Sequence, residues 1–428
     1  MPPSGDSVSL YAELLPNIRQ VSLVATLSSP HDGTTVAQVS GDGSRIQVRH
    51  RSAVEELTLP GQVSSPSLLP IQAKAGDPRT LSWRLPVASS VGLGGREGLD
   101  PVVPWTASDI KPGSAVTCRQ CTRELVADGR VGVWKDLPSE NWAEMMDFWH
   151  CHKPNDDGHG HSHSHSHDHG HVQDRPYTQE HLAQRAYGAN SSISAQKSVG
   201  FVDLTSFLFS EDDCSGLSFS VGDGSESHAS TADTLKALRA DSPAPRMLYV
   251  HCAGCTSHLG FFNTSIVSVA IFKWQVACQT LTPRLEPTSS DCLAASLLAT
   301  LARSGSSKSV VIPTVPVLPD TPSRGPADGS SSTGSPLYIW ILNGNMAYST
   351  SARRGAPRPA LKLLYRRISL EEADKFLESF SSDVQEVNFP VEAIEAAARS
   401  LDETGLHLPA AERSFKEWQV GLLGKWVG

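Results

Sequence analysis

The sequence lacks the long apolar runs that mark membrane segments: it has no stretch of 18 or more apolar residues, so no membrane span is expected. Residues 1–6 have neither the basic region nor the apolar run of a secretory signal peptide. Positive charge is also scarce, because 36 Lys and Arg residues stand against 45 Asp and Glu residues and leave a net charge of −9. Such a chain has no overall basic field for nucleic acid or anionic membranes. We therefore expect a cytoplasmic or nuclear protein that binds neither.

The sequence motifs of several large enzyme classes are missing as well. There is no phosphate-binding loop, nucleophile elbow or dinucleotide-binding glycine motif, and the glycines at 92–95 form only a turn-rich stretch. The sequence therefore gives no support for assigning the chain to the hydrolases, the kinases or the dinucleotide-dependent enzymes. The chain does contain eight cysteines. In a reducing compartment, paired Cys-x-x-Cys motifs indicate metal binding or redox chemistry rather than disulfides.

Alternating apolar residues predict a protein built mainly from β-strands. One face of an early strand would carry Val21, Leu23, Ala25 and Leu27. Further strands are expected at 81–85, 265–272, 337–342 and 361–365. Asn343-Gly344 predicts a turn, the capping box of Ser369 and Glu372 predicts one helix, and Pro390 predicts the start of another. The predicted fold class is mainly β with C-terminal helices (α+β), with the N-terminal strands forming one layer of a sandwich.

Composition divides the chain into regions. Polar and small residues dominate three segments, which cannot bury enough apolar surface to offset the entropy of ordering and are therefore expected to be disordered. The predicted division is an N-terminal β region at 1–110, a zinc-clipped central region at 111–302 with insertions at about 153–185 and 222–246, a linker at 303–336, and a C-terminal β and helical region at 337–428.

Two Cys-x-x-Cys pairs, Cys118 with Cys121 and Cys252 with Cys255, are followed by similar residues. Each pair turns the backbone so that both sulfurs face one point, and two pairs supply the four thiolates that zinc prefers. A redox site would need only one pair, opening a helix in a βαβ unit, and neither pair has that setting. We predict one structural Zn²⁺ that joins two β-hairpins distant in sequence. With Leu-Gly-Phe at 259–261, the second pair resembles zinc-bound β folds of the yippee type.

Residues 137–152 predict a helix with an aromatic and methionine-rich face. At helical spacing this face carries Trp142, Met145, Met146 and Trp149. The face is either core or a docking surface, which makes Trp142 and Trp149 candidate partner-binding residues. Cys151, between two histidines, is a candidate catalytic nucleophile or metal ligand. Its place at the C-terminal end of the helix disfavours a thiolate, so a structural role also stays open.

Together these motifs resemble the family of HECT-like, E2-binding ubiquitin-protein ligases, including its fungal members. The resemblance rests on both Cys-x-x-Cys pairs, on the Leu-Pro-Ser-Glu-Asn-Trp and Trp-x-Cys-His segments within 137–152, and on the Leu-Gly that follows the second pair. Similar segments also occur at 12–21, 340–343, 362–365 and 418–421. The resemblance covers nearly the whole chain apart from the three polar segments.

The resemblance implies a protein that binds a ubiquitin-conjugating enzyme (E2) and promotes transfer of ubiquitin to lysines of a protein substrate. It implies the metal ligands Cys118, Cys121, Cys252 and Cys255. It also makes Cys151 the candidate for a ubiquitin thioester, although positioning of a charged E2 alone remains an open mechanism. Relatives are linked to pre-mRNA cleavage and polyadenylation. The alternative is therefore a non-catalytic, zinc-stabilised binding or assembly factor for an E2 or a 3′-end cleavage subunit. A third hypothesis is a metal store in the His-rich loop at 159–171.

Overall fold

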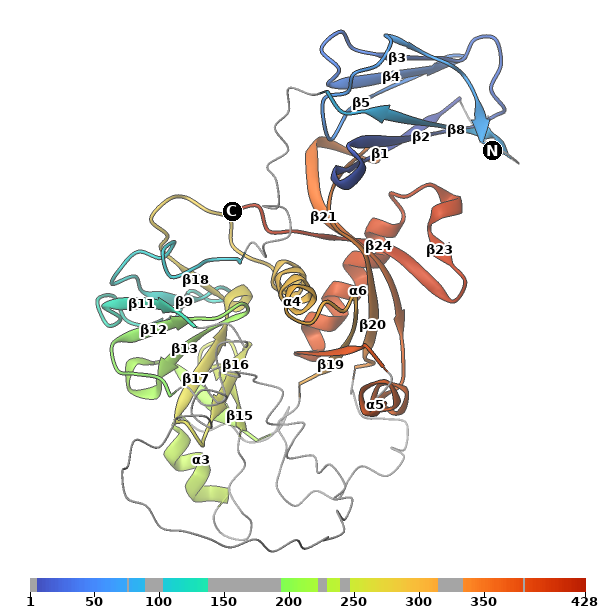
Figure 1. The fold of residues 1–428 in the computed structure, drawn as a ribbon. Helices are drawn as coiled ribbons and strands as arrows, with labels where there is room; N and C mark the ends of the chain where they lie inside the picture. Colours follow the sequence, from blue (N-terminus) through green and yellow to red (C-terminus); the bar gives the residue numbers. More distant parts are fainter. Residues whose placement is uncertain are drawn as a thin grey trace, which may run out of the picture. The chain divides into compact units, whose positions relative to one another are not determined.

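The computed structural model describes residues 6–74, 77–88, 103–137, 194–221, 229–238, 247–314, 334–379 and 382–428. These residues form two compact units (Figure 1). The first contains the described residues up to 105 and those from 284 onward, and the second contains the described residues from 106 to 283. Within the described ranges, no helix is long and apolar enough to cross a membrane. Most of the regular structure is β, which confirms the predicted fold class.

A ten-stranded sheet organises the first unit. Its order is β23 (Ser414–Phe415), β24 (Trp418–Gly424), β21 (Arg353–Arg367), β20 (Leu337–Thr350), β1 (Val8–Leu15), β2 (Gln20–Leu27), β8 (Asp77–Pro86) and β7 (Ala73–Lys74), with β19 (Lys308–Pro313) and β22 (Gln385–Phe389) joined through β20. The strands predicted near 81, 337 and 361 correspond to β8, β20 and β21. Each is longer than predicted, because polar residues at its ends still pair within the sheet.

A second sheet of four strands covers the N-terminal part of the first. It contains β5 (Ala53–Thr58), β4 (Arg45–His50), β3 (Val36–Val39) and β6 (Leu68–Leu69). Burial alternates strictly along β4, so its apolar residues point to one side. They share a core with β1, β2 and β8, where Leu23, Ile46 and Leu81 are fully buried. Figure 1 shows β3, β4 and β5 beside β1, β2 and β8. The predicted sandwich layer is therefore confirmed.

Strand β1 joins the two ends of the chain within one sheet. It pairs with β2 on one side and with β20 on the other, where Tyr11 lies opposite Thr350. A partly buried ion pair links β1 to β21 in the same sheet: Lys362 Nζ lies 2.8 Å from Glu13 Oε2, which also accepts a hydrogen bond from the Tyr11 hydroxyl. Strands from the predicted regions 1–110 and 337–428 thus belong to one sheet.

The turn predicted at Asn343-Gly344 is wrong, because β20 continues through it to Thr350. The pairing with β21 is irregular after Ile341, so the dipeptide produces a bulge instead of a reversal. A glycine suits this position because a Cβ on Gly344 would lie 3.1 Å from Cδ2 of Leu298, on helix α4 (Ser289–Ser304). Residues 347–350, beyond the bulge, pair with β1, and this second ladder favours extension over a turn.

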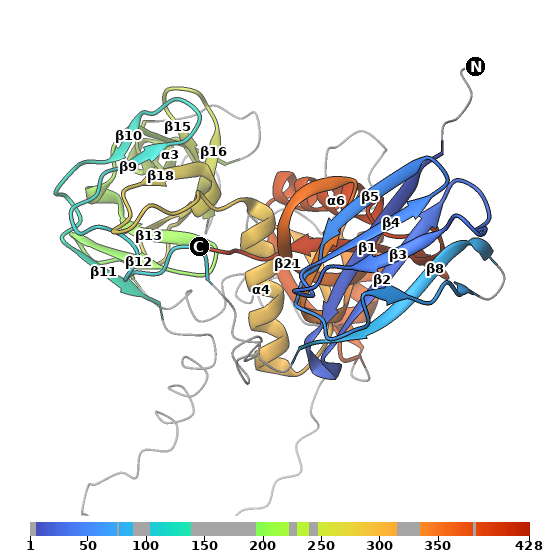
Figure 2. The ribbon, with the colours of Figure 1, turned by 90° about the horizontal axis from the view of Figure 1, so that it is seen from above.

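Three helices complete the described part of the first unit. The predicted cap at Ser369 begins α5 (Leu370–Glu378), since its hydroxyl accepts the Glu372 N–H at 3.1 Å. Pro390 precedes α6 (Val391–Gly405) as its N-cap. Helix α4, which was not predicted, begins with a capping box between Thr288 and Asp291. Helices α4 and α6 pack on each other and on β24 (Figure 2).

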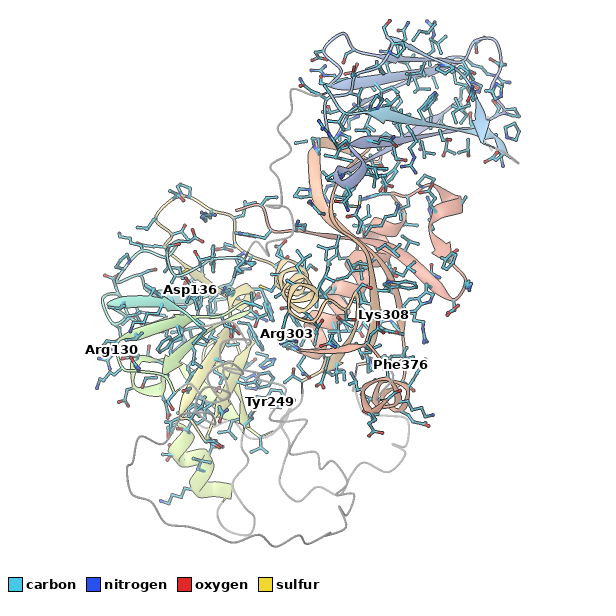
Figure 3. The ribbon with its side chains drawn as sticks, in the orientation of Figure 1. Arg130, Asp136, Tyr249, Arg303, Lys308 and Phe376 are labelled. Carbon is cyan, nitrogen blue, oxygen red and sulfur yellow. The ribbon has the colours of Figure 1, made fainter. Side chains whose placement is uncertain are left out.

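The second unit contains two sheets. The larger has the order β11 (Val133–Asp136), β12 (Val199–Val202), β13 (Ser206–Ser210), β17 (Ser268–Phe272), β16 (His258–Asn263), β15 (Met247–Cys252) and β14 (Leu217–Ser220). The smaller has the order β10 (Glu124–Val126), β9 (Val116–Cys118) and β18 (Val276–Cys278). The loop before β11 is held by Arg130, labelled in Figure 3, whose Nε lies 2.9 Å from the buried carboxylate of Asp213.

Two segments predicted to be disordered contain regular structure. The segment 222–246 includes helix α3 (Thr231–Leu238), whose first residue donates its hydroxyl to Glu211 and is buried. The segment 303–336 includes β19, where Val310 and Val311 are fully buried. In α3 the buried residues are Thr231 and Thr234, and the Thr231 hydroxyl bonds to Glu211, whereas in β19 a short apolar stretch joins a core built by distant parts of the chain. The predicted insertion at 153–185 lies outside the described residues.

Candidate metal centre

The first Cys-x-x-Cys pair lies at the turn between β9 and β10. Cys118 ends β9, and its N–H donates to the carbonyl of Arg123 at 2.8 Å. The carbonyl of Cys118 in turn accepts the N–H of Thr122, which adopts a left-handed backbone with φ of 60°. The Thr122 hydroxyl donates to the carbonyl of Cys121 at 2.7 Å. These bonds close a tight turn that directs both thiols to one side.

The second pair has the same construction between β15 and β16. The Cys252 N–H donates to the carbonyl of Ser257 at 3.0 Å, and the Cys252 carbonyl accepts the N–H of Thr256. Thr256 has φ of 59°, and its hydroxyl donates to the carbonyl of Cys255 at 2.7 Å. The threonine that follows each pair therefore has a structural role. The sequence carries this signal as a repeated Cys-x-x-Cys-Thr.

The two turns meet with their four sulfurs in a cluster. Cys118 Sγ lies 3.6 Å from Cys255 Sγ, and Cys121 Sγ lies 3.5 Å from Cys252 Sγ. All four sulfurs lie within 4.8 Å of one another. In a tetrahedral zinc–thiolate site with Zn–S bonds of about 2.3 Å, neighbouring sulfurs are about 3.8 Å apart. The spacing fits a metal ion held by four thiolates.

The surroundings of the four thiols differ. Cys118 and Cys252 are buried, whereas Cys121 and Cys255 are partly exposed. Burial raises the pKa of Cys118 to about 12. The Ser257 hydroxyl, 3.1 Å from Cys255 Sγ, lowers the pKa of Cys255 to about 6 because it donates a hydrogen bond to the thiolate. A bound cation would favour the thiolate form of all four.

Backbone contacts hold the two hairpins together around the cluster. The Ser215 N–H donates to the carbonyl of Leu125, and the Ala253 N–H donates to the carbonyl of Gly216, each at 2.8 Å. On the other side of the turn, the Arg119 guanidinium donates to the carbonyl of Val276 at 3.0 Å. The cluster therefore joins the smaller sheet to the larger one, as predicted for two hairpins distant in sequence.

Gly260, in the Leu-Gly-Phe segment after the second pair, is required by close packing. A Cβ at this position would lie 1.9 Å from the carbonyl oxygen of Ala270 on β17. Its neighbour Leu259 is fully buried. The segment thus fixes β16 against β17 directly beside the metal-binding turn.

Four thiolates leave a tetrahedral metal no open position, so the cluster can stabilise the fold but cannot bind a substrate on the metal. The other cysteines of the described residues are not part of it: Cys214, Cys278 and Cys292. The remaining predicted site residues, Cys151, Trp142 and Trp149, lie outside the described residues, as do the histidines at 159–171.

Comparison with known families gives the broader context of this centre. A family model described as "HECT-like Ubiquitin-conjugating enzyme (E2)-binding" matches residues 13–420, a range that includes all four clustered cysteines. This chain belongs to the HECT-like, E2-binding family. The resemblance inferred from the sequence motifs is confirmed. The family description identifies an E2 as the binding partner.

Two fungal relatives are similar to this family member. The uncharacterized protein C1734.10c of Schizosaccharomyces pombe is 23% identical over 335 residues, which cover 76% of this chain and 78% of the relative. The uncharacterized protein YJR141W of Saccharomyces cerevisiae is 28% identical over 156 residues, which cover 35% of this chain and 42% of the relative. This second match spans less than half the length of the relative. No solved structure matches the chain.

Proposed function

We propose that this protein is an E3 ubiquitin-protein ligase-like protein of the cytoplasm, the nucleus or both. In this proposal it binds an E2 carrying ubiquitin and promotes transfer of the ubiquitin to lysines of a protein substrate. The observation that carries the proposal is the family match, which extends over residues 13–420 and is described by E2 binding.

The proposal includes one Zn²⁺ at the four-cysteine cluster, with a structural role. Sulfur-only ligation at nearly tetrahedral spacing supports zinc over hard cations, which prefer oxygen ligands. The ion would hold the β9–β10 and β15–β16 hairpins together and would take no part in chemistry. Ubiquitin transfer would depend on other residues of the chain.

Two mechanisms are compatible with this role. In the first, the Cys151 thiolate attacks the carbonyl carbon of the E2–ubiquitin thioester, a new thioester forms, and the E2 thiolate leaves. A substrate lysine then attacks that thioester and releases Cys151. In the second, the protein holds the charged E2 so that the lysine attacks the E2 thioester directly, an effect of orientation alone.

A non-reducing gel tests the first mechanism. Purified protein is mixed with charged E2, and we expect a ubiquitin adduct that reducing agent removes and that Cys151→Ser abolishes. Cys214→Ser is the matched control, because Cys214 lies outside the metal cluster. If no adduct forms while lysine discharge from the E2 accelerates, positioning is the mechanism. If the protein neither binds the E2 nor affects discharge, the proposed function is wrong.

A non-catalytic binding or assembly factor is the second candidate. It is supported by six of the seven thiols of the described residues: the four clustered cysteines would be saturated by metal, and Cys292 is buried. Burial, with the charges of Asp213 and Glu211, also raises the pKa of Cys214 and disfavours its thiolate. The partner would be an E2 or a subunit of the pre-mRNA 3′-end cleavage and polyadenylation machinery.

Substitutions distinguish the second candidate from the first. For a binding factor, Cys151→Ser leaves cellular function intact, whereas Trp142→Glu or Trp149→Glu abolishes the partner pull-down. Full function of the tryptophan variants would exclude this surface. Loss of function in Cys151→Ser with partner binding intact would exclude a purely non-catalytic role.

A further inference from the structure

One arginine side chain crosses from the first metal-binding turn to the second. Arg123 follows the first Cys-x-x-Cys pair, and its carbonyl accepts the Cys118 N–H at 2.8 Å, which holds its backbone in the first turn. Its side chain extends to Gly254, which lies inside the second pair between Cys252 and Cys255. The two turns are therefore joined by this side chain as well as by the sulfur cluster.

The glycine inside the second pair makes room for this arginine. A Cβ on Gly254 would lie 2.6 Å from Nε of Arg123, 3.3 Å from its Cζ and 3.4 Å from its Cδ, and these are the three nearest atoms that it would meet. The backbone of Gly254 lies outside the left-handed region, so its conformation alone would allow another residue. The position of Arg123 is what favours a glycine at 254.

A second glycine lies against the stem of the same side chain. A Cβ on Gly216 would lie 2.9 Å from Cδ of Arg123 and 3.3 Å from its Cγ. The carbonyl of Gly216 also accepts the N–H of Ala253, the neighbour of Gly254, at 2.8 Å. The stem of Arg123 thus lies against one glycine and its Nε against the other, which directs the guanidinium over the second turn.

The charge of the loaded centre gives this placement a physical consequence. Four thiolates carry twice the charge of one Zn²⁺, so the loaded centre is an anion. Arginine stays protonated at any physiological pH. In the described part of the second unit, ion pairs join Arg130 to Asp213 and Lys197 to Asp212, and none involves Arg123. The charge of Arg123 is therefore not neutralised by a carboxylate partner.

We propose that Arg123 is a positioning residue of the metal centre, whose guanidinium lies on the second Cys-x-x-Cys turn, offsets the negative charge of the zinc–thiolate cluster and slows loss of the metal. The inference rests on the proposed function, in which the cluster holds one structural Zn²⁺. It adds a role in metal retention for a residue that is not a ligand. Because the side chain is exposed, its removal should leave both sheets of the second unit intact.

Competition with a chromogenic chelator, on the full zinc-loaded chain, measures the dissociation constant of Zn²⁺. Arg123→Gln removes the charge, and we expect it to raise this constant about tenfold, the low end of the range for groups that support a ligand shell. Arg123→Lys keeps the charge and should stay within about threefold of the unsubstituted chain. Lys135→Gln is the control, because it removes an exposed charge from β11 of the same unit, and it should change the constant less than about twofold.

Salt separates a charge effect from a packing effect. Dissolved ions screen exposed charges, so raising the concentration of a weakly coordinating salt such as sodium nitrate should weaken the attraction of Arg123 for the cluster. Zinc affinity should therefore fall more steeply with salt in the unsubstituted chain than in Arg123→Gln. Equal salt dependence in the two proteins would overturn the electrostatic role.

A double-mutant cycle tests the geometry. In Gly254→Ala the new Cβ would displace the Arg123 side chain from the turn, so zinc should bind about threefold more weakly or worse. In an Arg123→Ala background the same change should have little effect, because the atoms that this Cβ would approach most closely belong to Arg123. Gly132→Ala, whose Cβ would meet nothing within 4 Å, is the matched control.

The possible failures are distinguishable. If the unsubstituted chain holds one zinc and Arg123→Gln and Gly254→Ala keep its dissociation constant within about twofold, the role of Arg123 is wrong and the zinc assignment stands. Additive effects of Gly254→Ala and Arg123→Ala would overturn the contact between the two residues. A chain that binds no zinc would refute the zinc of the proposed function itself. Circular dichroism of each loaded variant shows whether the sheets are intact, so that a loss of affinity is assigned to the metal centre.

Discussion

At the scale of single residues, the four sulfurs of the metal centre act as one group. Because each thiolate occupies one corner of the shell, Cys252→Ser removes a ligand that no other residue of the cluster can replace. We expect the zinc content to fall from one per chain to nearly zero. The free energy of unfolding of the second unit should fall by several kcal/mol, since metal binding is coupled to folding.

Elemental analysis and thermal unfolding of purified protein measure these two effects. The control is Cys214→Ser, whose thiol contacts only the carbonyl of Ser210 among the bonds recorded for it. The control should keep its zinc. A Cys252→Ser protein with full zinc content and an unchanged unfolding midpoint would refute the assignment of the centre.

A second prediction at this scale concerns the buried pair of Lys362 and Glu13, which are 16% and 9% exposed in their side chains. Lys362→Met leaves the carboxylate of Glu13 buried without its cation and should reduce the free energy of unfolding by about 3–5 kcal/mol. Denaturant titration measures this loss. The double variant Glu13→Gln with Lys362→Met should recover at least about half of it, and a double variant as unstable as the single one would contradict the argument.

The residue scale is also where sequence was most informative about the site. The cysteine spacing is a local pattern, so the four sulfurs could be grouped before their positions were known. The Ser257 hydroxyl on Cys255 and the pairing of Lys362 with Glu13 could not be predicted, because each depends on how strands align in space. Neither has a sequence signature.

At the scale of secondary-structure elements, β16 depends on a glycine. In Gly260→Ala the new Cβ would lie 1.9 Å from the Ala270 carbonyl oxygen, so β16 and β17 must separate. We expect a loss of about 3 kcal/mol or more in the free energy of unfolding and weaker metal binding at the neighbouring turn. Gly132→Ala is the control, because a Cβ there meets nothing within 4 Å. Equal stability of the two variants would contradict this packing argument.

Strands and helices were predicted correctly where the sequence periodicity was strong. They were predicted incorrectly where contacts with distant parts of the chain determined the local structure. The alternation in the N-terminal strands and the Ser369 cap were readable locally. At Gly344, the turn signal was overridden by pairing of β20 with both β1 and β21. Strand β19 lies at the edge of a Ser/Pro/Gly tract. It could not be predicted from its own sequence, because its valines are buried only through pairing with β20 and β22.

At the scale of the whole molecule, the second unit has the form of an insertion. Its first and last segments are adjacent: Ile110 and Thr280 form an antiparallel bridge, and the Leu281 N–H donates to the carbonyl of Asp109 at 2.8 Å. Inserted domains with neighbouring ends commonly fold alone. Residues 106–283, expressed separately, should therefore bind one zinc and unfold cooperatively.

The matching fragment 1–110 should behave differently, because its strand β1 would lose its partner β20 and expose an unpaired edge. We expect this fragment to aggregate. Circular dichroism and light scattering of both fragments test the pair of expectations. A stable, soluble 1–110 together with an unfolded 106–283 would contradict the division into units.

Release of the metal from the whole protein should also depend on pH. Protons compete with the metal for thiolates, so metal affinity falls as the pH falls. Acidification from about pH 7 to about pH 4, or addition of a chelator, should unfold the second unit before the first, whose described residues contain no cysteine cluster. Zinc release followed with a chromogenic chelator, together with limited proteolysis, measures the order. Simultaneous loss of both units would show that they do not fold independently.

Cys252 follows Cys121 by 131 positions, and this separation fixes the order in which the two turns are synthesised. Ribosomes add about 5–20 residues per second, so the first metal-binding turn waits roughly 7–26 seconds for the second to be made. During that interval the nascent chain offers two thiols, half of a shell, to the cell. Correct biogenesis therefore depends on keeping an early Cys-x-x-Cys reduced until its partner emerges, and oxidative stress would act on the unfinished chain before it acts on the mature protein.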